Sequence, residues 1–356
     1  VAQSVDGLKV LPLADIDNAQ PREKPGGSAG SLADPVLIIY TSGTTGRPKG
    51  AVLTQQALVT NAIGSVDLHK MAADDRVLVV LPLFHVGGLT ISLTPALYAG
   101  ATVELHSRFD PGQTLEAIER FRPQVLVLVP ATMMAVMKLP GWTDADTSSL
   151  RVLTTGSMVV PVELIAAFED KGISVVQVYG STETCPIAAY TQPGEGRSNP
   201  ETTGKAGCCS QTRIVDANGR AIDTPDVDGE IEIRGDHVMQ GYWNSRRETA
   251  DAFNGDWYRT GDIGSIDAEG NLYFRERARH TIVSGGENIY PAEVERVLTA
   301  IPGVAEAAVC GIADEQWGEV PAAGIVLAPD SEVTQGCIEQ ALARELARFK
   351  HPKQIT

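Results

Sequence analysis

Short apolar runs alternate with amphipathic stretches over the first half of this sequence. The runs that we expect to form strands are Val36–Tyr40, Val77–Leu81, Thr102–Leu105, Val125–Val129, Arg151–Thr155 and Val175–Tyr179, and the helices expected between them include Gln55–Lys70, Gln113–Phe121 and Val162–Lys171. Thr54 before the first of these helices and Gly172 after the last are residues typical of helix boundaries. This alternation predicts βα units around a largely parallel sheet.

The pattern changes from Thr212 onward. Glycine-punctuated strands are expected at Arg213–Asp216, Glu230–Arg234 and Leu272–Arg275, which indicates a smaller β-rich subdomain. A boundary is expected near residues 276 to 282. Beyond it, helices at Ala292–Ala300 and Gln335–Phe349 with strands at Ala305–Ile312 and Ala322–Leu327 predict a compact α+β domain.

The segment Tyr40–Gly50 follows the first apolar run and reads YTSGTTGRPKG. Glycines let the backbone turn its N–H groups inward, hydroxyls donate hydrogen bonds to phosphate oxygens, and Lys49 supplies positive charge. The composition therefore favours a loop that wraps around polyphosphate. It is not a Walker loop, because no Gly-Lys-Ser/Thr follows at the required spacing and Pro48 obstructs the helix start. The alternative from these residues alone is a polar surface turn.

Composition narrows the choice of partner. The chain has 356 residues and a formal net charge of −16, so nucleic acid is an unfavourable partner. Anionic ligands then need local cations, for which Lys49, Arg259, Arg277 and Arg279 are candidates. No apolar run approaches the ~20 residues of a membrane span. The five cysteines lack C-x-x-C spacing, which favours free thiols in a reducing cytoplasm over disulfides or a zinc site.

Further segments in order along the chain carry a resemblance to a known family. They are Leu81–Gly88 (LPLFHVGG), Tyr179–Thr184 (YGSTET), Gly229–Gly235 (GEIEIRG), Tyr258–Asp262 (YRTGD) and Ser284–Glu295 (SGGENIYPAEVE). Together with the Tyr40–Gly50 loop they resemble the adenylate-forming superfamily of acyl-CoA synthetases, peptide-synthetase adenylation domains and firefly-type luciferases. One such segment is weak evidence, but their order and spread make the resemblance specific.

The resemblance implies an α/β adenylate-forming fold. We expect an N-terminal AMP-binding domain at residues 1–276, made of parallel α/β sheets and a small β-rich subdomain. A mobile C-terminal lid domain is expected at residues 277–356, with a hinge near Arg279. The family also has a substantial upstream portion and a catalytic lysine in a Pro-x-x-x-x-Gly-Lys context. Both lie outside this sequence, so we expect it to be a fragment of a longer enzyme.

The resemblance assigns the nucleotide contacts residue by residue. The expected β- and γ-phosphate ligands are Thr41, Ser42, Gly43, Thr44, Thr45, Gly46 and Lys49, and the expected adenine contacts are Gly156, Ser157, Met158 and Tyr179. Thr182 is expected to donate to the α-phosphate and Glu183 to bind Mg²⁺, which prefers carboxylate and phosphate oxygens. Asp262 and Arg277 are expected at the ribose, where an ionised carboxylate accepts hydrogen bonds from both hydroxyls.

The hinge region departs from the family's pattern, and the acyl region narrows the range of substrates. Glu276 stands where the family has glycine, and His280 where it has an acid, while Arg279 keeps the hinge position. Gly285, Gly286 and Glu287 are expected to line the coenzyme A tunnel. His85, Val86 and Gly180 are expected at the acyl pocket, with His85 counted among the catalytic residues. The aspartate that pairs an amino-acid ammonium is replaced by His85 after Phe84, which disfavours an amino-acid substrate.

The implied activity is an AMP-forming acyl-CoA synthetase that uses ATP, Mg²⁺ and coenzyme A. Its small-molecule substrate is a carboxylic acid, fatty or aromatic, because the Leu89–Thr94 segment is apolar apart from small hydroxyls. The alternatives are acyl transfer to a carrier protein, a luciferase-like oxygenase and a non-catalytic nucleotide-binding fragment. The sequence leaves the oligomeric state open, and a homodimer is one alternative.

Overall fold

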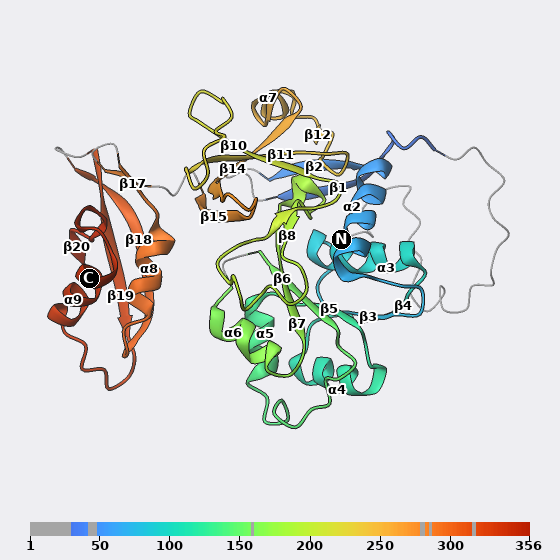
Figure 1. Cartoon of the computed structure of the whole chain (residues 1–356), viewed down its shortest axis with the longest axis horizontal. Helices are drawn as coiled ribbons and strands as arrows, with labels where there is room; N and C mark the ends of the chain where they lie inside the picture. Colours follow the sequence, from blue (N-terminus) through green and yellow to red (C-terminus); the bar gives the residue numbers. More distant parts are fainter. Residues whose placement is uncertain (1–29, 42–47, 158–159, 278–281, 285–286, 315–317) are drawn as a thin grey trace, which may run out of the picture. The chain divides into compact units, whose positions relative to one another are not determined.

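The protein is described here by a computed structural model covering residues 30–41, 48–157, 160–277, 282–284, 287–314 and 318–356. Contacts divide the chain into residues 1–32 and residues 33–356. All the elements below belong to the second unit and are labelled as in Figure 1.

Strands and short helices alternate along the described chain. The strands are β1 (Pro35–Thr41), β2 (Lys49–Thr54), β3 (Arg76–Val79), β4 (Thr102–Leu105), β5 (Val125–Val127), β6 (Val152–Gly156), β7 (Ser174–Tyr179), β8 (Ala189–Tyr190), β9 (Lys205–Ala206), β10 (Gln211–Val215), β11 (Gly229–Arg234), β12 (Gly241–Tyr242), β13 (Phe253–Asn254), β14 (Trp257–Ile266), β15 (Leu272–Arg277), β16 (Ile282–Ser284), β17 (Glu287–Ile289), β18 (Val304–Asp314), β19 (Gly318–Leu327) and β20 (Gln354–Ile355). The α-helices are α2 (Gln55–His69), α3 (Thr94–Ala99), α4 (Pro111–Phe121), α5 (Pro130–Met137), α6 (Val162–Glu169), α7 (Arg246–Asp251), α8 (Pro291–Thr299) and α9 (Gln335–Glu345), with a π-helix at Gly87–Leu93 and 3₁₀ turns at Thr182–Thr184 and Arg348–Lys350.

The central sheet confirms the predicted parallel arrangement. Its order is β4-β3-β5-β6-β7-β8-β9, and β3 to β7 pair in parallel, while β8 and β9 add an antiparallel edge. The strands are apolar on both faces. Leu126 packs into one core with α4, α5 and α6, whereas its neighbours Val125 and Val127 pack into cores that include residues of the α2–α3 region. Helices therefore cover both faces, as a buried parallel sheet requires.

The first apolar run does not belong to this sheet, so our prediction for Val36–Tyr40 is wrong in its pairing. β1 pairs antiparallel with β2, and β12 joins β2 on its other side. The segment Lys49–Thr54 was not predicted as a strand. The expected phosphate loop therefore links two strands of a hairpin rather than a strand and a helix. The second strand was not recognised in the sequence because the Lys49–Thr54 segment has only three apolar residues, Ala51, Val52 and Leu53.

The later parts of the chain form two further sheets. The expected β-rich region has the order β10-β11-β14-β13 with β15 on β14, all antiparallel. The last region has the order β17-β16-β19-β18 with β20 parallel to β19, and helices α8 and α9 share its core. The helix expected to run to Phe349 ends at Glu345, because Leu346 takes an extended conformation.

Helix ends follow the capping chemistry expected from the sequence. Thr54 accepts a hydrogen bond from the Ala57 N–H at 3.1 Å and so caps α2, as predicted. Asp110 does the same for α4 through the Gln113 N–H at 2.9 Å.

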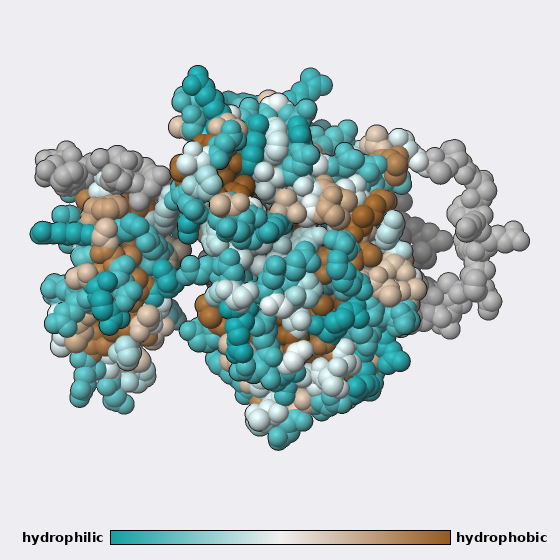
Figure 2. All heavy atoms as spheres, in the orientation of Figure 1, coloured by the Kyte–Doolittle hydropathy of each residue, from teal (hydrophilic) through white to brown (hydrophobic). Residues whose placement is uncertain are grey.

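Polar side chains predominate on the face seen in Figure 2, where apolar ones form separate patches. In the described part of the chain, no helix combines the length and apolar character needed to cross a membrane.

Candidate nucleotide-binding site

The base of the expected phosphate loop is a β-hairpin. Thr41 ends β1 and Lys49 begins β2, and the Thr41 hydroxyl lies 3.5 Å from the Lys49 carbonyl oxygen. Ser42, Gly43, Thr44, Thr45 and Gly46 lie outside the described residues. The hairpin thus fixes the two ends of the loop.

Tyr242 of β12 lies beside this hairpin and connects it to Glu183. The Lys49 ammonium nitrogen is 5.1 Å from the centre of the Tyr242 ring, within the range of a cation–π contact. The Tyr242 hydroxyl donates a 2.9 Å hydrogen bond to Glu183 Oε1. The Trp243 N–H donates to the Gly50 carbonyl at 2.7 Å and holds β12 against β2. Tyr242 therefore joins the phosphate-loop lysine to the expected metal ligand.

Tight backbone packing sets the position of Glu183. Thr182–Thr184 form a single 3₁₀ turn after β7, and the Ser181 N–H donates to the Thr184 hydroxyl at 2.8 Å. A Cβ atom at Gly180 would overlap the carbonyl oxygen of Pro186, so only glycine fits there. The Glu183 carbonyl accepts a 2.7 Å hydrogen bond from Met239. The side chain is consequently held at a defined place in the fold.

The Glu183 carboxylate is buried but only partly engaged. It is 8% exposed, and within the described residues its one side-chain partner is the Tyr242 hydroxyl on Oε1. The other oxygen, Oε2, is left for a ligand. Burial and the adjacent negative charge raise the pKa of Tyr242 above its ordinary value, so the phenol remains a donor at neutral pH.

A second tyrosine–carboxylate pair lies at the end of β7. The Tyr179 hydroxyl donates a 2.7 Å hydrogen bond to Asp262 Oδ2, and Arg277 Nε lies 2.9 Å from Asp262 Oδ1. Asp262 Oδ1 is buried and makes no hydrogen bond of good geometry in the described structure. Burial raises the pKa of Asp262, although Arg277 and Tyr179 favour its charged form. Asp262 thus offers a buried acceptor beside a cation.

The Tyr179 ring lies against the β-rich region. Its ring centre lies 6.2 Å from that of Phe274. Gly156 ends β6 next to β7, where a Cβ would lie 2.6 Å from the Val178 carbonyl oxygen. Ser157 follows with φ 75°, and Met158 lies outside the described residues. Gly156 and Tyr179 therefore end neighbouring parallel strands at the same sheet edge, where open α/β sheets bind their ligands.

His85 and Val86 lie at the start of the π-helix. His85 is exposed, and its ring lies 4.6 Å from that of Phe84. Gly88 approaches the Leu81 and Pro82 carbonyl oxygens closely enough that a Cβ would overlap them. That contact fixes the turn presenting His85. It also explains the second glycine of the LPLFHVGG segment, whereas a Cβ at Gly87 would make only an ordinary contact with Leu81.

The predicted hinge and tunnel residues lie mostly outside the described chain. This applies to Arg279, Gly285 and Gly286, whereas Glu287 is described only as part of β17. Glu276, which replaces the family's glycine, is buried. It accepts hydrogen bonds from the Arg277 N–H at 2.8 Å and from the Ala292 N–H of α8 at 3.3 Å. A carboxylate at the start of a helix is favourable, which gives this departure a structural reason.

Sequence reasoning missed Tyr242 altogether. Its one local signal is the Gly241-Tyr242-Trp243 run itself, a pattern equally typical of packing. Only the pairing of β12 with β2 brings its ring to Lys49 and its hydroxyl to Glu183. Nor do the described residues contain a group of three or more His, Cys, Asp or Glu side chains suited to a metal ion.

The fold is that of an α/β protein with two buried carboxylates that each accept a tyrosine hydroxyl, and comparison with known proteins specifies its family. Residues 3–243 match the model of the AMP-binding enzyme, and residues 293–356 match the model of the AMP-binding enzyme C-terminal domain. This chain belongs to the AMP-binding enzyme family, as its motifs predicted.

Its relatives include several CoA ligases. The chain is 49% identical over 321 residues to an indoleacetate–CoA ligase of Aromatoleum aromaticum, covering 90% of this chain and 63% of the relative. It is 38% identical to a feruloyl-CoA synthase of an Amycolatopsis species, covering 97% and 70%. A solved o-succinylbenzoate CoA synthetase from Bacillus subtilis, in complex with its acyl-adenylate intermediate, superposes with a TM-score of 0.83 at 34% identity, covering 91% of this chain and 66% of that one. The chain thus spans about two thirds of these proteins.

Proposed function

We propose that this chain is the greater part of an AMP-forming acyl-CoA synthetase. A carboxylic acid attacks the α-phosphorus of ATP to give acyl-AMP and pyrophosphate. The thiol of coenzyme A then attacks the acyl carbonyl and releases AMP. The observation that carries the proposal is the Lys49–Tyr242–Glu183 arrangement, which joins a phosphate-loop cation to a partly engaged carboxylate.

This arrangement fits a magnesium–ATP complex. Mg²⁺ is held by one or two carboxylates plus substrate phosphates rather than by an all-protein cage. A single carboxylate with one unengaged oxygen suits that role, and the lack of a larger ligand cluster in the described part of the chain agrees with it. Mg²⁺, when bound, would neutralise phosphate charge, and Glu183 would hold it. Lys49 and the Thr41–Gly46 loop would hold the β- and γ-phosphates, and Thr182 would donate to the α-phosphate.

Tyr179 and Asp262 fit the nucleoside. In the proposed complex the Tyr179 ring stacks on adenine, and Gly156, Ser157 and Met158 close the other face of the base. Asp262 accepts hydrogen bonds from the ribose hydroxyls, and Arg277 is the second ribose contact. The support for this is the buried Asp262 carboxylate, whose Oδ1 forms an ion pair with Arg277 at 2.9 Å but no hydrogen bond of good geometry in the described structure.

The substrate we propose is an aromatic carboxylic acid. His85, Val86 and Gly180 border its pocket, and the Gly87–Leu93 helix is apolar apart from Thr90 and Ser92. The indoleacetate and feruloyl names of two relatives support an aromatic acid over a fatty acid. A hydrophobic pocket discriminates one methylene by only about 1–3 kcal/mol, so related acids are expected to compete.

The thioester half-reaction is assigned to the C-terminal region. We propose that residues 277–356 form a lid that turns about Arg279 and brings Gly285, Gly286 and Glu287 to a coenzyme A tunnel. The boundary at residue 276 is supported by the gap between the two family matches, at residues 243 and 293.

Mass spectrometry of the full-length protein with ATP, Mg²⁺, coenzyme A and a panel of aromatic and fatty acids tests the proposal. We expect acyl-CoA products from arylacetic or hydroxycinnamic acids. Acyl-AMP without acyl-CoA would replace coenzyme A by a carrier-protein acceptor. Nucleotide binding without pyrophosphate release from any acid would overturn the proposed activity.

A further inference from the structure

Two adjacent cysteines lie together in a turn that contributes no residue to the proposed nucleotide site. Cys208 and Cys209 occupy the middle of the turn between β9 and β10, closed by a 2.9 Å hydrogen bond from the Ser210 N–H to the Gly207 carbonyl. Their sulfur atoms are 3.6 Å apart. Cys208 is exposed, and Cys209 is half-buried. The turn is anchored by the Gly207 N–H, which donates to the Ala188 carbonyl at 2.9 Å.

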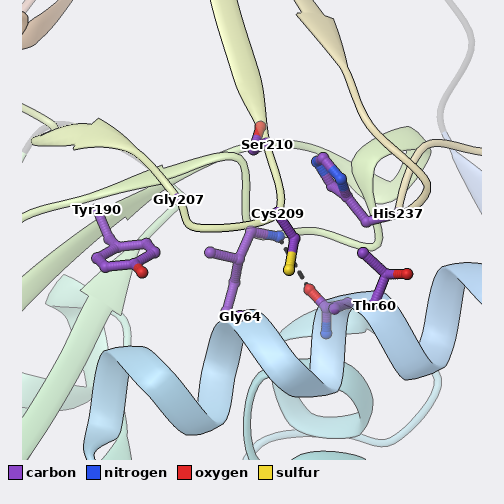
Figure 3. A pocket seen from close by; sticks show the side chains of 9 residues that line it. Thr60, Gly64, Tyr190, Gly207, Cys209, Ser210 and His237 are labelled. Carbon is purple, nitrogen blue, oxygen red and sulfur yellow. Dashed lines mark hydrogen bonds between the residues drawn. The ribbon is translucent and has the colours of Figure 1, made fainter.

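Cys209 lines a small pocket that contains unpartnered polar atoms. Its walls include Thr60, Asn61 and Gly64 of α2 and the side chains of Ser210 and His237. Figure 3 shows the Cys209 sulfur on the side of the turn that faces α2, with the His237 ring beside the turn. His237 is 1% exposed, and the Cys209 backbone lies beside its ring, but neither ring nitrogen makes a hydrogen bond of good geometry in the described structure, and the Ser210 hydroxyl has no partner there. Buried polar atoms without partners call for an explanation.

The sulfur–sulfur distance suits one shared ion better than a disulfide. Two sulfurs bound to one soft ion at ~2.3 Å, the length of a zinc–thiolate bond, lie about 3.5–3.8 Å apart for bond angles near 100–110°. The observed 3.6 Å falls in this range. A disulfide instead prefers Cα atoms about 4.4–6.8 Å apart, whereas adjacent residues joined by a trans peptide are held at about 3.8 Å. Chelation therefore needs no rearrangement of the turn.

We propose that Cys208 and Cys209 form a two-thiol binding site for a soft, thiophilic ion of the trivalent arsenic class. Soft thiolate ligands select soft ions. This site shares no residue with the proposed nucleotide site and does not depend on the proposed function.

The two thiols have different parts in capture. Burial and the neighbouring Cys208 raise the pKa of Cys209 to about 11, so Cys209 is a protonated thiol at neutral pH. The exposed Cys208 therefore reacts first, and Cys209 closes the ring. With phenylarsine oxide, two arsenic–sulfur bonds form and the arsenic–oxygen bond breaks. The two thiol protons leave with that oxygen as water, and arsenic stays trivalent.

Titration of the full chain with phenylarsine oxide, followed by intact-mass spectrometry, tests the site. We expect one phenylarsenic group per chain, released by an added dithiol but not by a monothiol. Cys208→Ser and Cys209→Ser should each weaken capture by about 10²–10⁴-fold, the usual gain from a second tethered contact. The control is the Cys310→Ser, Cys337→Ser double variant, which removes the two other exposed cysteines and should bind as the wild type does.

Equal capture by Cys208→Ser and the wild type would overturn the proposal, as would release by a monothiol. Because Cys208 is exposed, its replacement should leave the fold intact, and circular dichroism checks this. Loss of capture only in the Cys310, Cys337 variant would place the reactive thiols elsewhere and likewise reject this site.

Discussion

Glu183 and Asp262 are two buried carboxylates that have similar hydrogen-bond partners but differ in their ion pairing. Each accepts a tyrosine hydroxyl, from Tyr242 at 2.9 Å and from Tyr179 at 2.7 Å, and each has a cation nearby. Arg277 forms an ion pair with Asp262 itself, whereas the cation near Glu183, Lys49, contacts the Tyr242 ring. Asp262 therefore has a partner on each oxygen, whereas within the described residues Glu183 has a side-chain partner on Oε1 alone. This difference suits Asp262 to a neutral ribose and Glu183 to a metal.

The largest expected effect comes from Gly180, which lies in the chain between Tyr179, the partner of Asp262, and Glu183. Replacing it with alanine forces a methyl group into the Pro186 carbonyl. We expect Gly180→Ala to cost about 3 kcal/mol or more of unfolding free energy, at or above the upper end for overpacking. Denaturant unfolding measures this.

Gly172→Ala is the matched control for this prediction. Gly172 also has positive φ, at +80°, but no atom lies near its missing Cβ. That variant should show only the backbone cost of about 1–2 kcal/mol. Equal costs for both variants would contradict steric crowding at Gly180.

Removing each carboxylate should separate metal from nucleoside functions. In the full-length enzyme, Glu183→Gln should lower pyrophosphate formation about 10²–10³-fold, as loss of an electrostatic contact in the transition state does. Asp262→Asn should chiefly raise KM for ATP, about tenfold. It should also reduce the preference for ATP over 2′-deoxyATP. The comparison fails if both variants alter metal dependence and ribose preference alike.

The tyrosine hydroxyls should have smaller and equally distinct effects. Tyr242→Phe keeps the ring beside Lys49 but removes the donor to Glu183, so Mn²⁺ affinity in the presence of ATP should fall about tenfold, since hydrogen bonds to charged groups contribute about 1.5–3 kcal/mol. Electron paramagnetic resonance of bound Mn²⁺ measures this without turnover. Tyr179→Phe should leave Mn²⁺ binding nearly unchanged and weaken nucleotide binding instead.

Tyr190→Phe is the control for both substitutions. The Tyr190 hydroxyl donates to Asp67 at 2.9 Å, which is the same type of bond at another site. Its loss should change neither metal nor nucleotide affinity. A Tyr190→Phe variant that behaved like Tyr242→Phe would show that the effect is structural.

The smallest expected effect is a pH dependence of stability. Burial raises the pKa of Asp262 in the folded state, so the native protein holds this proton to higher pH than the unfolded chain does. The contribution of Asp262 to stability therefore falls as pH rises above the ordinary value of 3.8. Asp262→Asn should thus gain Tm relative to the wild type as pH rises from about 4.

Asp67→Asn should show the opposite sign. Lys70 and Tyr190 lower the pKa of Asp67, so its stabilising contribution is present above 3.8 and is lost as pH falls. Thermal scans of both variants against the wild type across the acid range make the comparison. Parallel curves would contradict the difference between the two environments.

The sequence predicted the parallel sheet because each strand carries its own signal. The runs at β3, β5 and β7 are apolar on both faces, and that pattern is local and independent of partners. It could not predict that β1 pairs with β2, because pairing depends on contacts that hydrophobicity does not encode. The short α5 was also missed, since its run of apolar residues has no helical periodicity in so short a length.

The candidate site also has some features that the sequence predicted and others that only the structure revealed. Glu183, Lys49 and Asp262 were identified from segments with a specific order in the chain, and their roles remain predictions. The position of Tyr242 and the contacts of Asp262 with Tyr179 and Arg277 came only from the structure, because residues distant in sequence meet there. Glu276 shows the same limit, since its replacement of glycine was visible but its bonds to Arg277 and Ala292 were not.

The sequence by itself determined the family, the α/β class and the identity of the charged groups, because motifs and strand patterns are local properties of the chain. Only the tertiary structure decided which of these groups are neutralised and which keep an acceptor for a ligand. It also decided that Cys209 shares a pocket with His237. The physical reason is that burial, ion pairing and hydrogen bonding depend on neighbours that chain folding alone brings together.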